Sequence, residues 1–243
     1  MQLYFIRHGQ SGNNLLWAQT GSSQGRSEDP ALTPTGQQQA QHVARFLNQN
    51  STIANSAPGA WATQNVNGFG ITHLYCSLMI RAVATGTAIA TEIGLPLIAW
   101  KDLHETGGIH CINQETGEYI GLPGKNRAYF RNNFPNLVLP DDLGAEGWWN
   151  RPFEKREERA PRAQRVLREL LERHGGTDDR VAMVSHGGFH IWFLASILNL
   201  SNRNGYWFTL NNTAMTRIDF ENDSRVNLVY MNRADYLPRE LIT

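Results

Sequence analysis

An arginine and a histidine directly follow an apolar segment near the start of the chain. Residues 3–6 are aromatic or aliphatic, and Arg7, His8 and Gly9 come next. Such an apolar run is typical of a buried strand, and the glycine lets the backbone turn sharply as it leaves the sheet. In open α/β sheets, ligands bind at the carboxyl ends of strands. Because arginine can hold a phosphoryl group and histidine can attack one, this junction predicts phosphoryl chemistry.

Two further predicted strands end in side chains of the same kinds. The strand that ends at Cys76 is followed closely by Arg81, and the strand that ends at Ser185 is followed by His186 and Gly187. Parallel strands bring their carboxyl ends to one edge of the sheet, so we expect these groups to converge on the first histidine. A tetrahedral phosphoryl group needs several N–H donors around its charged oxygens. The glycine permits close approach of the backbone, and helix amino termini add attraction for an anion.

The order of the elements that position these groups predicts an α/β fold. Apolar residues recur at helical spacing in some segments and form short continuous runs in others. The predicted helices cover 37–47, 81–93, 154–174 and 189–200, and the predicted strands cover 3–6, 71–76, 181–185, 214–220 and 225–231. The last two strands are joined by a turn-forming cluster and should form an antiparallel hairpin. Strands that alternate with helices imply a layered, mostly parallel sheet.

Two irregular segments interrupt this order. Residues 50–70 have no sustained period and look like an insertion at the surface. Residues 104–150 are rich in Gly, Asn, Pro and aromatic residues and are longer than an ordinary connection. We expect the second segment to form a cap over the site. The 243 residues, of which 41% are hydrophobic, suit a single domain, 1–243, that carries this cap as an insertion.

The charge balance argues against several classes of partner. Lysine plus arginine and aspartate plus glutamate each total 22, so the net charge is zero and no overall field favours nucleic acid or an anionic membrane. The longest apolar stretch, 189–200, is shorter than the roughly 20 residues that span a bilayer. No leader with a cleavage site precedes Arg7, which predicts a cytoplasmic protein. Cys76 and Cys111 are too few for a disulfide framework and are expected to be structural.

Taken in order, the motifs of the chain closely resemble those of the histidine phosphatase superfamily, also called the phosphoglycerate mutase-like or RHG family. The resemblance covers nearly the whole chain, and five separate motifs occur in the right order. The matching positions are Arg7-His8-Gly9 with Asn14, Leu32-Thr33 with Gly36, Gln39 and Ala40, Ser77 with Arg81-Ala82 and Thr85, Leu103-His104-Glu105, and Ser185-His186-Gly187-Gly188. The resemblance implies a three-layer sandwich around a mainly parallel, six-stranded sheet.

The same resemblance implies a role for each group at the strand ends. His8 would attack phosphorus and form a phosphohistidine that water later hydrolyses. Arg7, Arg81 and His186 would bind the phosphoryl oxygens, and Asn14 would add a neutral contact. The two arginines should lower the pKa of His8, which keeps the attacking imidazole neutral. Since the arginines do here what magnesium does in other phosphoryl-transfer sites, neither a metal nor a cofactor is expected.

Glu105 matches the position that supplies the acid in this family. It would protonate the leaving oxygen and later help to activate water. A free glutamate is ionised at neutral pH, whereas a bound phosphate dianion and the exclusion of water favour the neutral acid. We therefore expect protonation of Glu105 to be coupled to substrate binding, and an acidic or near-neutral pH optimum.

The sequence follows the family pattern less closely around the rim of the pocket. The residues of this rim determine which substrate binds. Thr106 and two glycines follow Glu105, in place of the basic, tyrosine-containing run with which phosphoglycerate mutases hold a second anionic group. This difference favours the phosphatase branch. Lys125 and Arg127 in the expected cap are nevertheless candidates for binding a carboxylate or a second phosphate.

Three functions follow from these observations. The leading one is a phosphatase that hydrolyses a small phosphorylated metabolite, with a phosphoprotein as the other candidate substrate. The second is a mutase that moves phosphate between substrate positions, and the third is a module that binds phosphorylated ligands without turnover. A metal site built on His104, His110 and Cys111, or on His186 and His190, lacks a recognised ligand spacing and is not expected.

Overall fold

The computed structural model describes residues 1–49, 64–65, 68–200, 207–223 and 225–243. Its core is a seven-stranded sheet in the order β6-β3-β2-β7-β1-β8-β9. The strands are β1 (Gln2–Arg7), β2 (His73–Cys76), β3 (Leu97–Ala99), β6 (Leu137–Val138), β7 (Arg180–Ser185), β8 (Met215–Phe220) and β9 (Val226–Arg233). Strands β6, β3, β2, β7 and β1 run parallel, and β8 and β9 are antiparallel additions beside β1. The expected α/β class with a mainly parallel sheet is confirmed.

The sheet has one strand more than the six that were expected. Two of the seven strands, the three-residue β3 and the two-residue β6, were not among the strands predicted by range, and they pair through Leu97↔Leu137 and Ile98↔Val138. A two-residue strand is too short to show the alternation of apolar and polar residues that reveals strands in a sequence. Its existence therefore depends on where the chain returns to the edge of the sheet.

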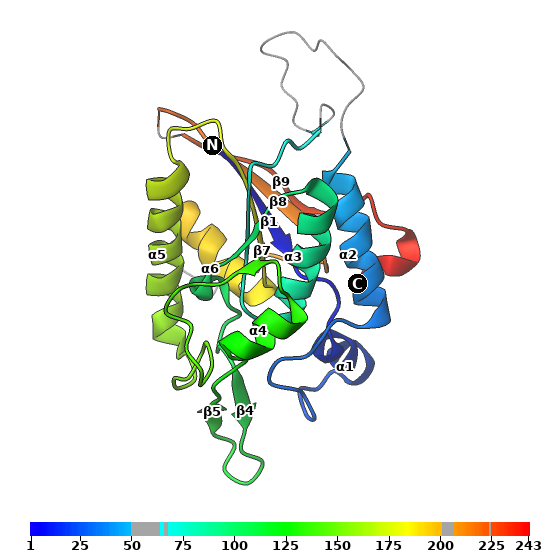
Figure 1. Cartoon of the computed structure of the whole chain (residues 1–243), viewed down its shortest axis with the longest axis vertical. Coiled ribbons are helices and arrows are strands. Elements are labelled where there is room, and N and C mark those ends of the chain that lie inside the picture. Colours follow the sequence, from blue (N-terminus) through cyan, green and yellow to red (C-terminus); the bar gives the residue numbers. More distant parts are fainter. Residues whose placement is uncertain (50–63, 66–67, 201–206, 224) are drawn as a thin grey trace.

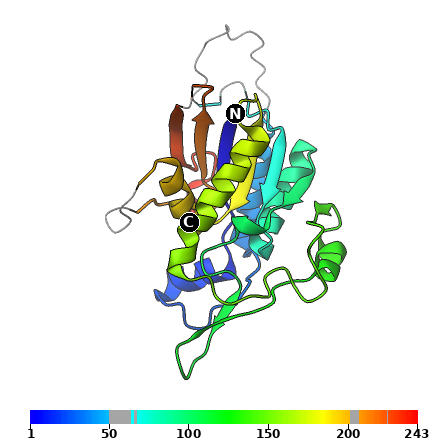
Figure 2. The same cartoon turned by 90° about the vertical axis from the view of Figure 1, so that its left-hand side faces the viewer.

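Helices cover both faces of the sheet. Helices α2 (Pro34–Leu47) and α3 (Ile80–Ile93) lie on one face, and α5 (Arg156–His174) and α6 (Gly187–Ile197) lie on the other (Figure 1). Figure 2, turned by 90°, shows α5 crossing in front of the strands. The three-layer arrangement expected from the sequence is confirmed.

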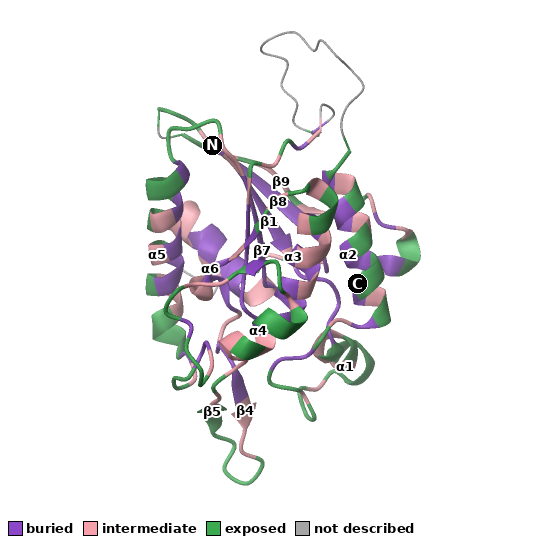
Figure 3. Cartoon of the chain, in the orientation of Figure 1, coloured by how far each residue is buried: buried purple, intermediate pink, exposed green. Residues whose placement is uncertain are grey.

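Alternating side chains of β1 pack against the two helical layers. Tyr4 and Ile6 belong to the apolar cluster on the α2–α3 side, and Leu3 and Phe5 belong to the cluster on the α5–α6 side. Successive residues of a strand point to opposite faces, so a strand buried on both faces reads as a continuous apolar run. Figure 3 shows the central strands buried between the helices. This packing holds the carboxyl end of β1 in place.

Several local signals in the sequence produce the elements they predicted. The Thr33 hydroxyl caps α2 by accepting a hydrogen bond from the Gly36 amide at 3.0 Å. Gly94, with a φ of 72°, ends α3. The predicted hairpin is formed by β8 and β9. Helix α5 begins at Arg156, two residues later than predicted, because the buried Glu154 takes part in contacts described below.

Other elements lie at the end of the sheet where β1 finishes (Figure 1). They are α1 (Gly12–Thr20), α4 (Arg127–Asn133) and the hairpin of β4 (His110–Ile112) with β5 (Tyr119–Gly121). Two short 3-10 turns complete the structure, Lys101–Leu103 and Arg239–Leu241. The segment expected to form a cap, 104–150, thus contains a hairpin, a helix and the edge strand β6.

Three further observations concern the insertion expected at 50–70, the two cysteines and membrane-spanning helices. The expected insertion at 50–70 lies largely outside the described residues. Both cysteines are free, and burial raises the pKa of the Cys76 thiol. Within the part of the chain that the structure describes, no helix is both long and apolar enough to cross a membrane.

Candidate active site

The ends of three neighbouring strands bring the basic residues together. In the parallel register, Arg7 lies opposite Ser185 and Cys76 lies opposite Val184, so β1, β7 and β2 finish side by side. The rings of His8 and His186, which follow β1 and β7, have centroids 5.0 Å apart. The Arg81 Nε lies 3.1 Å from the His8 Nε2. Three groups that are distant along the chain, His8, Arg81 and His186, therefore lie around one point.

His8 has a hydrogen-bond pattern that prepares one ring nitrogen for attack. Its Nδ1 lies 2.6 Å from the carbonyl oxygen of Gly9, and we assign the ring proton to Nδ1 because a carbonyl can only accept. The lone pair is then on Nε2, which faces Arg81. Burial, followed by the charges of Arg81 and Arg7, lowers the pKa of His8 well below its usual value. At neutral pH the ring is a neutral base with Nε2 available to a phosphorus atom.

Arg7 is half-buried beside His8, and the nitrogen donors of its guanidinium group differ in their surroundings. One terminal nitrogen donates to the carbonyl of Leu210. Its Nε is buried and has no hydrogen-bond partner among the described residues. Gly187 approaches closely, since a Cβ built there would lie 3.5 Å from that Nε. Arg7 and the backbone that begins α6 thus border the same small region.

His186 is fully buried and is held through one ring nitrogen. Its Nε2 lies 2.9 Å from the Ser77 hydroxyl, whereas its Nδ1 is buried and finds no partner in the described part of the chain. Burial, followed by the charge of Arg81, lowers the pKa of His186 well below its usual value. This leaves one ring nitrogen of His186 free to contact a phosphoryl oxygen.

The carboxylate of Glu105 is held at the amino terminus of α6. Its Oε1 accepts hydrogen bonds from the amides of Thr106 at 2.7 Å and Phe189 at 2.9 Å, and its Oε2 accepts from the Gly188 amide at 3.1 Å. Unpaired N–H groups and the helix dipole favour a negative charge at this position. Since Oε2 has the single donor, it is the oxygen with capacity for a proton. The helix therefore orients Glu105 toward the site.

Gly188 is required for this position of Glu105. A Cβ built on Gly188 would lie 2.4 Å from the Glu105 Oε1, closer than real contacts allow. The Gly188→Ala variant should therefore displace the carboxylate and lower kcat/KM for an alkyl phosphate by about 10- to 100-fold, since general acid catalysis contributes about 10²–10⁴-fold. The loss should be smaller for p-nitrophenyl phosphate, whose leaving group needs no proton.

Gly144→Ala is a matched control for that experiment, because a Cβ there would meet no atom within 4 Å. Steady-state kinetics on both esters and a thermal melt of each variant make the comparison. Equal losses of kcat/KM on the two esters would show that Gly188→Ala does not act through the acid.

A buried ion pair from α5 supports the loop that carries Glu105. Arg162 donates to the carbonyls of Asp102 at 2.7 Å and His104 at 3.0 Å, and it pairs with Glu154. The Glu154 Oε2 in turn accepts from the Gly107 amide at 3.1 Å. Neither residue was predicted from the sequence, where they look like ordinary charges on an amphipathic helix. Only their burial distinguishes them.

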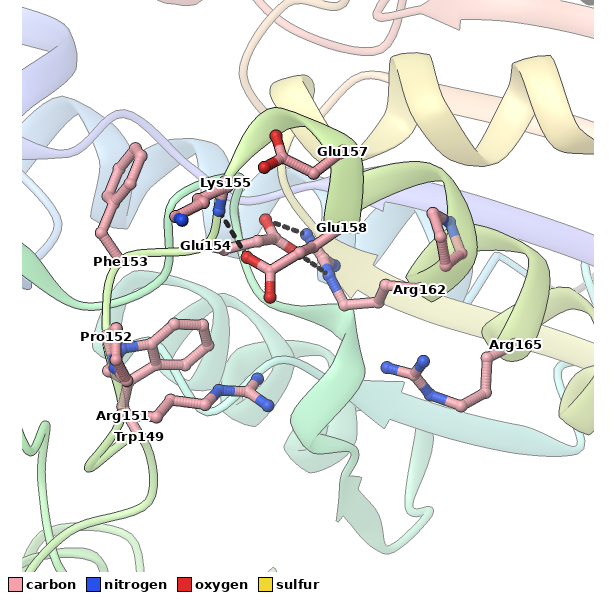
Figure 4. Close-up of a pocket in the computed structure, with 11 residues that line it drawn as sticks. Trp149, Arg151, Pro152, Phe153, Glu154, Lys155, Glu157, Glu158, Arg162 and Arg165 are labelled. Atoms are coloured by element: carbon pink, nitrogen blue, oxygen red, sulfur yellow. Dashed lines mark hydrogen bonds and ion pairs between the residues drawn. The ribbon is translucent and has the colours of Figure 1, made fainter.

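A pocket of about 780 Å³ lies on the outer side of this ion pair (Figure 4). Arg151 reaches into it over the Trp149 ring, at 3.9 Å from the ring centre, and Arg165 faces it from α5. Neither His8 nor His186 lines this pocket. The reacting groups are therefore separate from it.

Asp29 is a buried carboxylate that the sequence reading did not single out. Its Oδ1 accepts from the Ile80 amide at 3.1 Å and lies 3.6 Å from a terminal nitrogen of Arg81. Burial raises the pKa of Asp29 to about 6, against the opposing charges of Arg81 and Lys125. Asp29 therefore holds the guanidinium that contacts His8 and offsets part of its charge.

The affinity for inorganic phosphate should change with pH as the Asp29 carboxyl titrates. As the pH falls through about 6, the carboxyl gains a proton, the charge of Arg81 is no longer offset, and phosphate should bind more tightly. The Asp29→Asn variant should bind phosphate about fivefold more tightly at pH 7, equivalent to roughly 1 kcal/mol. Inhibition constants measured from pH 5 to 8 for both proteins test this, because the titration of phosphate itself is common to both. A step of equal size in the variant would exclude Asp29 as its cause.

Asn14 lies next to His8 through a second asparagine. The side chain of Asn212 donates to the His8 carbonyl at 3.0 Å and to the Asn14 Oδ1 at 3.3 Å. The same Oδ1 accepts from the Ser11 amide at 3.1 Å, which caps α1. Asn212 was not predicted, although its place just before β8 is a usable signal, since β8 runs antiparallel to β1 and begins at the site.

The two basic candidates of the cap differ in their surroundings. Lys125 is half-buried, and its charge lowers the pKa of Asp29, so it lies on the side of the site where Asp29 pairs with Arg81. Arg127 donates from Nε to the Leu143 carbonyl at 2.8 Å and from Nη2 to the Pro140 carbonyl at 2.6 Å. The contacts of Arg127 thus hold the backbone at Pro140 and Leu143 against the start of α4.

The histidines considered as metal ligands make other contacts. The two ring nitrogens of His104 lie near the Glu105 carbonyl and Arg151, at 2.8 Å and 3.2 Å. The Nδ1 of His110 lies 3.1 Å from the Gly108 carbonyl, and the Nε2 of His190 lies 3.0 Å from the Thr216 hydroxyl. Within the described residues, neither set gathers three ligand atoms.

Comparison with known families decides what kind of protein carries this geometry. Residues 3–58 and 59–233 match the histidine phosphatase superfamily (branch 1). The chain belongs to the histidine phosphatase superfamily. The match covers every residue discussed above around the paired histidines.

The individual relatives of this histidine phosphatase share little sequence identity with it. It is 26% identical over 221 residues to a protein of Yersinia enterocolitica named probable phosphoglycerate mutase GpmB, covering 91% of this chain and 86% of that protein. It also resembles the crystal structure of a phosphoserine phosphatase from Entamoeba histolytica, with a TM-score of 0.60 and 23% identity over 98% of this chain and 99% of the other. For the alpha-ribazole phosphatase of Shigella flexneri, the TM-score is 0.61 and the identity 18% over 96% of each chain. These structures establish the fold.

Proposed function

We propose that this histidine phosphatase hydrolyses phosphomonoesters through a phosphohistidine at His8. The observation that carries the proposal is the convergence of two imidazoles and two guanidinium groups on one point, with the neutral Nε2 of His8 at its centre. In the first step Nε2 forms a bond to phosphorus while the bond from phosphorus to the ester oxygen breaks. In the second step water attacks phosphorus, the bond to Nε2 breaks, and inorganic phosphate leaves.

Two cationic side chains and one neutral imidazole would supply the electrostatic stabilisation in this scheme. Arg7, Arg81 and the free nitrogen of His186 would donate hydrogen bonds to the oxygens of the phosphoryl group, which carry the negative charge in the transition state. The Nε of Arg81 would exchange its contact with His8 for one with phosphate. Asn14, next to the His8 backbone, would add a neutral donor.

Glu105 would transfer the protons of both steps. Its Oε2 has only the Gly188 amide as a partner, so a proton on that oxygen can pass to the leaving alkoxide. The resulting carboxylate can then take a proton from the attacking water.

We propose a small phosphorylated metabolite as the substrate. His8 is only 3% exposed and His186 is fully buried, which suits a small ester that enters the site better than a phosphorylated side chain on a protein surface. Similar folds include phosphatases named for phosphoserine and for glucosyl-3-phosphoglycerate, both small metabolites. Residues 104–150 would act as the cap, with Lys125 contacting a second anionic group of the substrate.

A mutase is the second candidate, because the curated relatives of similar length are named probable phosphoglycerate mutases. The loop after Glu105 argues for hydrolysis. It continues through Gly107 and Gly108, both with positive φ and both packed against aromatic rings, and offers no side chain there to hold a second anion.

Incubation with 3-phosphoglycerate and with a panel of metabolite phosphates separates the two functions. We expect release of inorganic phosphate to account for nearly all the substrate consumed. Isomerised product in excess of free phosphate would establish the mutase instead. Phosphate binding without turnover of any ester in the panel would favour the third function, a module that binds phosphorylated ligands without hydrolysing them.

A further inference from the structure

Two histidines and an aspartate meet at the opposite end of the sheet from the active site. His73 is the first residue of β2, His174 is the last residue of α5, and Asp179 immediately precedes β7. Both strands run from this cluster toward the paired histidines of the active site, so the cluster lies at their amino ends. About a hundred residues separate His73 from the other two in the sequence, which is why no spacing motif groups them.

The distances within the cluster suit a shared ion. The His174 Nδ1 lies 2.8 Å from one carboxylate oxygen of Asp179, and the His73 Nδ1 lies 3.8 Å from the other. One ligand atom from each residue can be chosen so that all three lie within 4.8 Å of one another. Ligand atoms around a tetrahedral zinc ion, at bond lengths of about 2.0–2.1 Å, are separated by about 3.3 Å. The partly exposed His73 would have to rotate to close the difference, and its Nδ1 would then leave the Thr72 hydroxyl, which lies 2.9 Å away.

The donor set favours one class of ion. Two imidazole nitrogens and one carboxylate oxygen are ligands of zinc and similar transition metals, whereas magnesium and calcium prefer oxygen alone. The side chains of His73 and Asp179 are 37% and 27% exposed, so an ion can reach the cluster and water can occupy the remaining position. The His174 side chain, at 4% exposed, provides a rigid ligand.

Tyr75 can hold the His174 ring in place with or without a metal, because its hydroxyl can both donate and accept. Its hydroxyl lies 3.0 Å from the His174 Nε2. Without an ion, the Asp179 carboxylate can only accept, so the ring proton is on Nδ1 and Nε2 accepts from the Tyr75 hydroxyl. When an ion takes the lone pair of Nδ1, the proton moves to Nε2, and the same hydroxyl accepts it. Hydrogen bonds of this kind to the second ring nitrogen hold the orientation and protonation state of histidine ligands in metal sites.

We propose that His73, His174 and Asp179 bind one zinc ion. The ion links the start of β2 to the connection between α5 and β7 and stabilises the fold. It takes no part in phosphoryl transfer, because the cluster is at the other end of these strands. The site is thus independent of the proposed phosphatase function.

Titration of the chelator-treated protein with Zn²⁺ in a calorimeter, and with Co²⁺ in a spectrophotometer, tests the site. We expect one equivalent to bind, the cobalt bands of a four-coordinate nitrogen and oxygen site, and a higher Tm with Zn²⁺ that a chelator reverses. His73→Gln and Asp179→Asn should each weaken binding by more than tenfold. Tyr75→Phe should weaken it by about 10- to 100-fold, as expected for loss of an orienting contact.

His42→Gln, a change on α2 away from the cluster, is the matched control and should bind as the wild type does. The basal hydrolysis rate of His73→Gln and Asp179→Asn should equal that of the wild type, which also shows that these variants fold. Absence of binding by the wild-type protein would overturn the proposal and leave the cluster as a hydrogen-bonded His–Asp pair. Undiminished binding in both variants would equally overturn it, because the ion would then occupy other ligands.

Discussion

The His8→Ala variant should lose nearly all hydrolytic activity, with kcat lowered by about 10⁴-fold or more. Removal of a catalytic nucleophile has effects of this size, because the remaining groups bind the substrate but offer no path through a covalent intermediate. Alanine also removes the hydrogen bonds of the ring with Gly9 and Arg81, neither of which holds the sheet together. Steady-state rates on the best ester from the metabolite panel measure the loss.

Rapid quenching with ³²P-labelled substrate tests the role of His8 more directly. We expect label on the wild-type protein that survives alkali and is lost in acid, as phosphohistidine behaves, and none on His8→Ala. His42→Ala, a change outside the site, should retain both the label and the activity. Label that persists in His8→Ala, or that resists acid in the wild type, would assign the intermediate to another residue.

The Arg81→Gln variant should lower kcat/KM by about 10²–10³-fold. Loss of one charged donor that faces the developing charge costs about 3–4 kcal/mol in a site that excludes water. Here the effect has a second cause, since Arg81 also contacts the His8 Nε2 and pairs with Asp29. Without Arg81, the buried carboxylate of Asp29 loses its nearest cation and would repel the phosphate.

Two comparisons isolate this effect. Arg45→Gln removes an exposed arginine of α2 and should leave kcat/KM unchanged. The double variant Arg81→Gln with Asp29→Asn should recover part of the loss, because it removes the uncompensated carboxylate. A double variant no better than the single one would show that Asp29 does not act on phosphate through its charge.

The groups around the phosphoryl position follow rules that operate at short range. Arg7, His8 and His186 each lie within two residues of the end of an apolar run, and the ends of parallel strands meet at one edge, so their convergence could be predicted without coordinates. The helix boundaries set by Thr33 and Gly94 were equally readable, because a cap is a local hydrogen bond or a local left-handed turn. The irregular cap segment offered no such rule, and its hairpin and β6 were not predicted.

What the sequence by itself determined is therefore the family, the layered α/β fold and the basic residues at the strand ends, since periodicity and motif order specify these. Only the tertiary structure decided what holds those residues in position. Asp29 on Arg81, Arg162 behind Glu105 and Asn212 beside His8 are contacts between distant segments. In the sequence each looks like an ordinary polar residue, because burial and the choice of partner arise only when the layers pack.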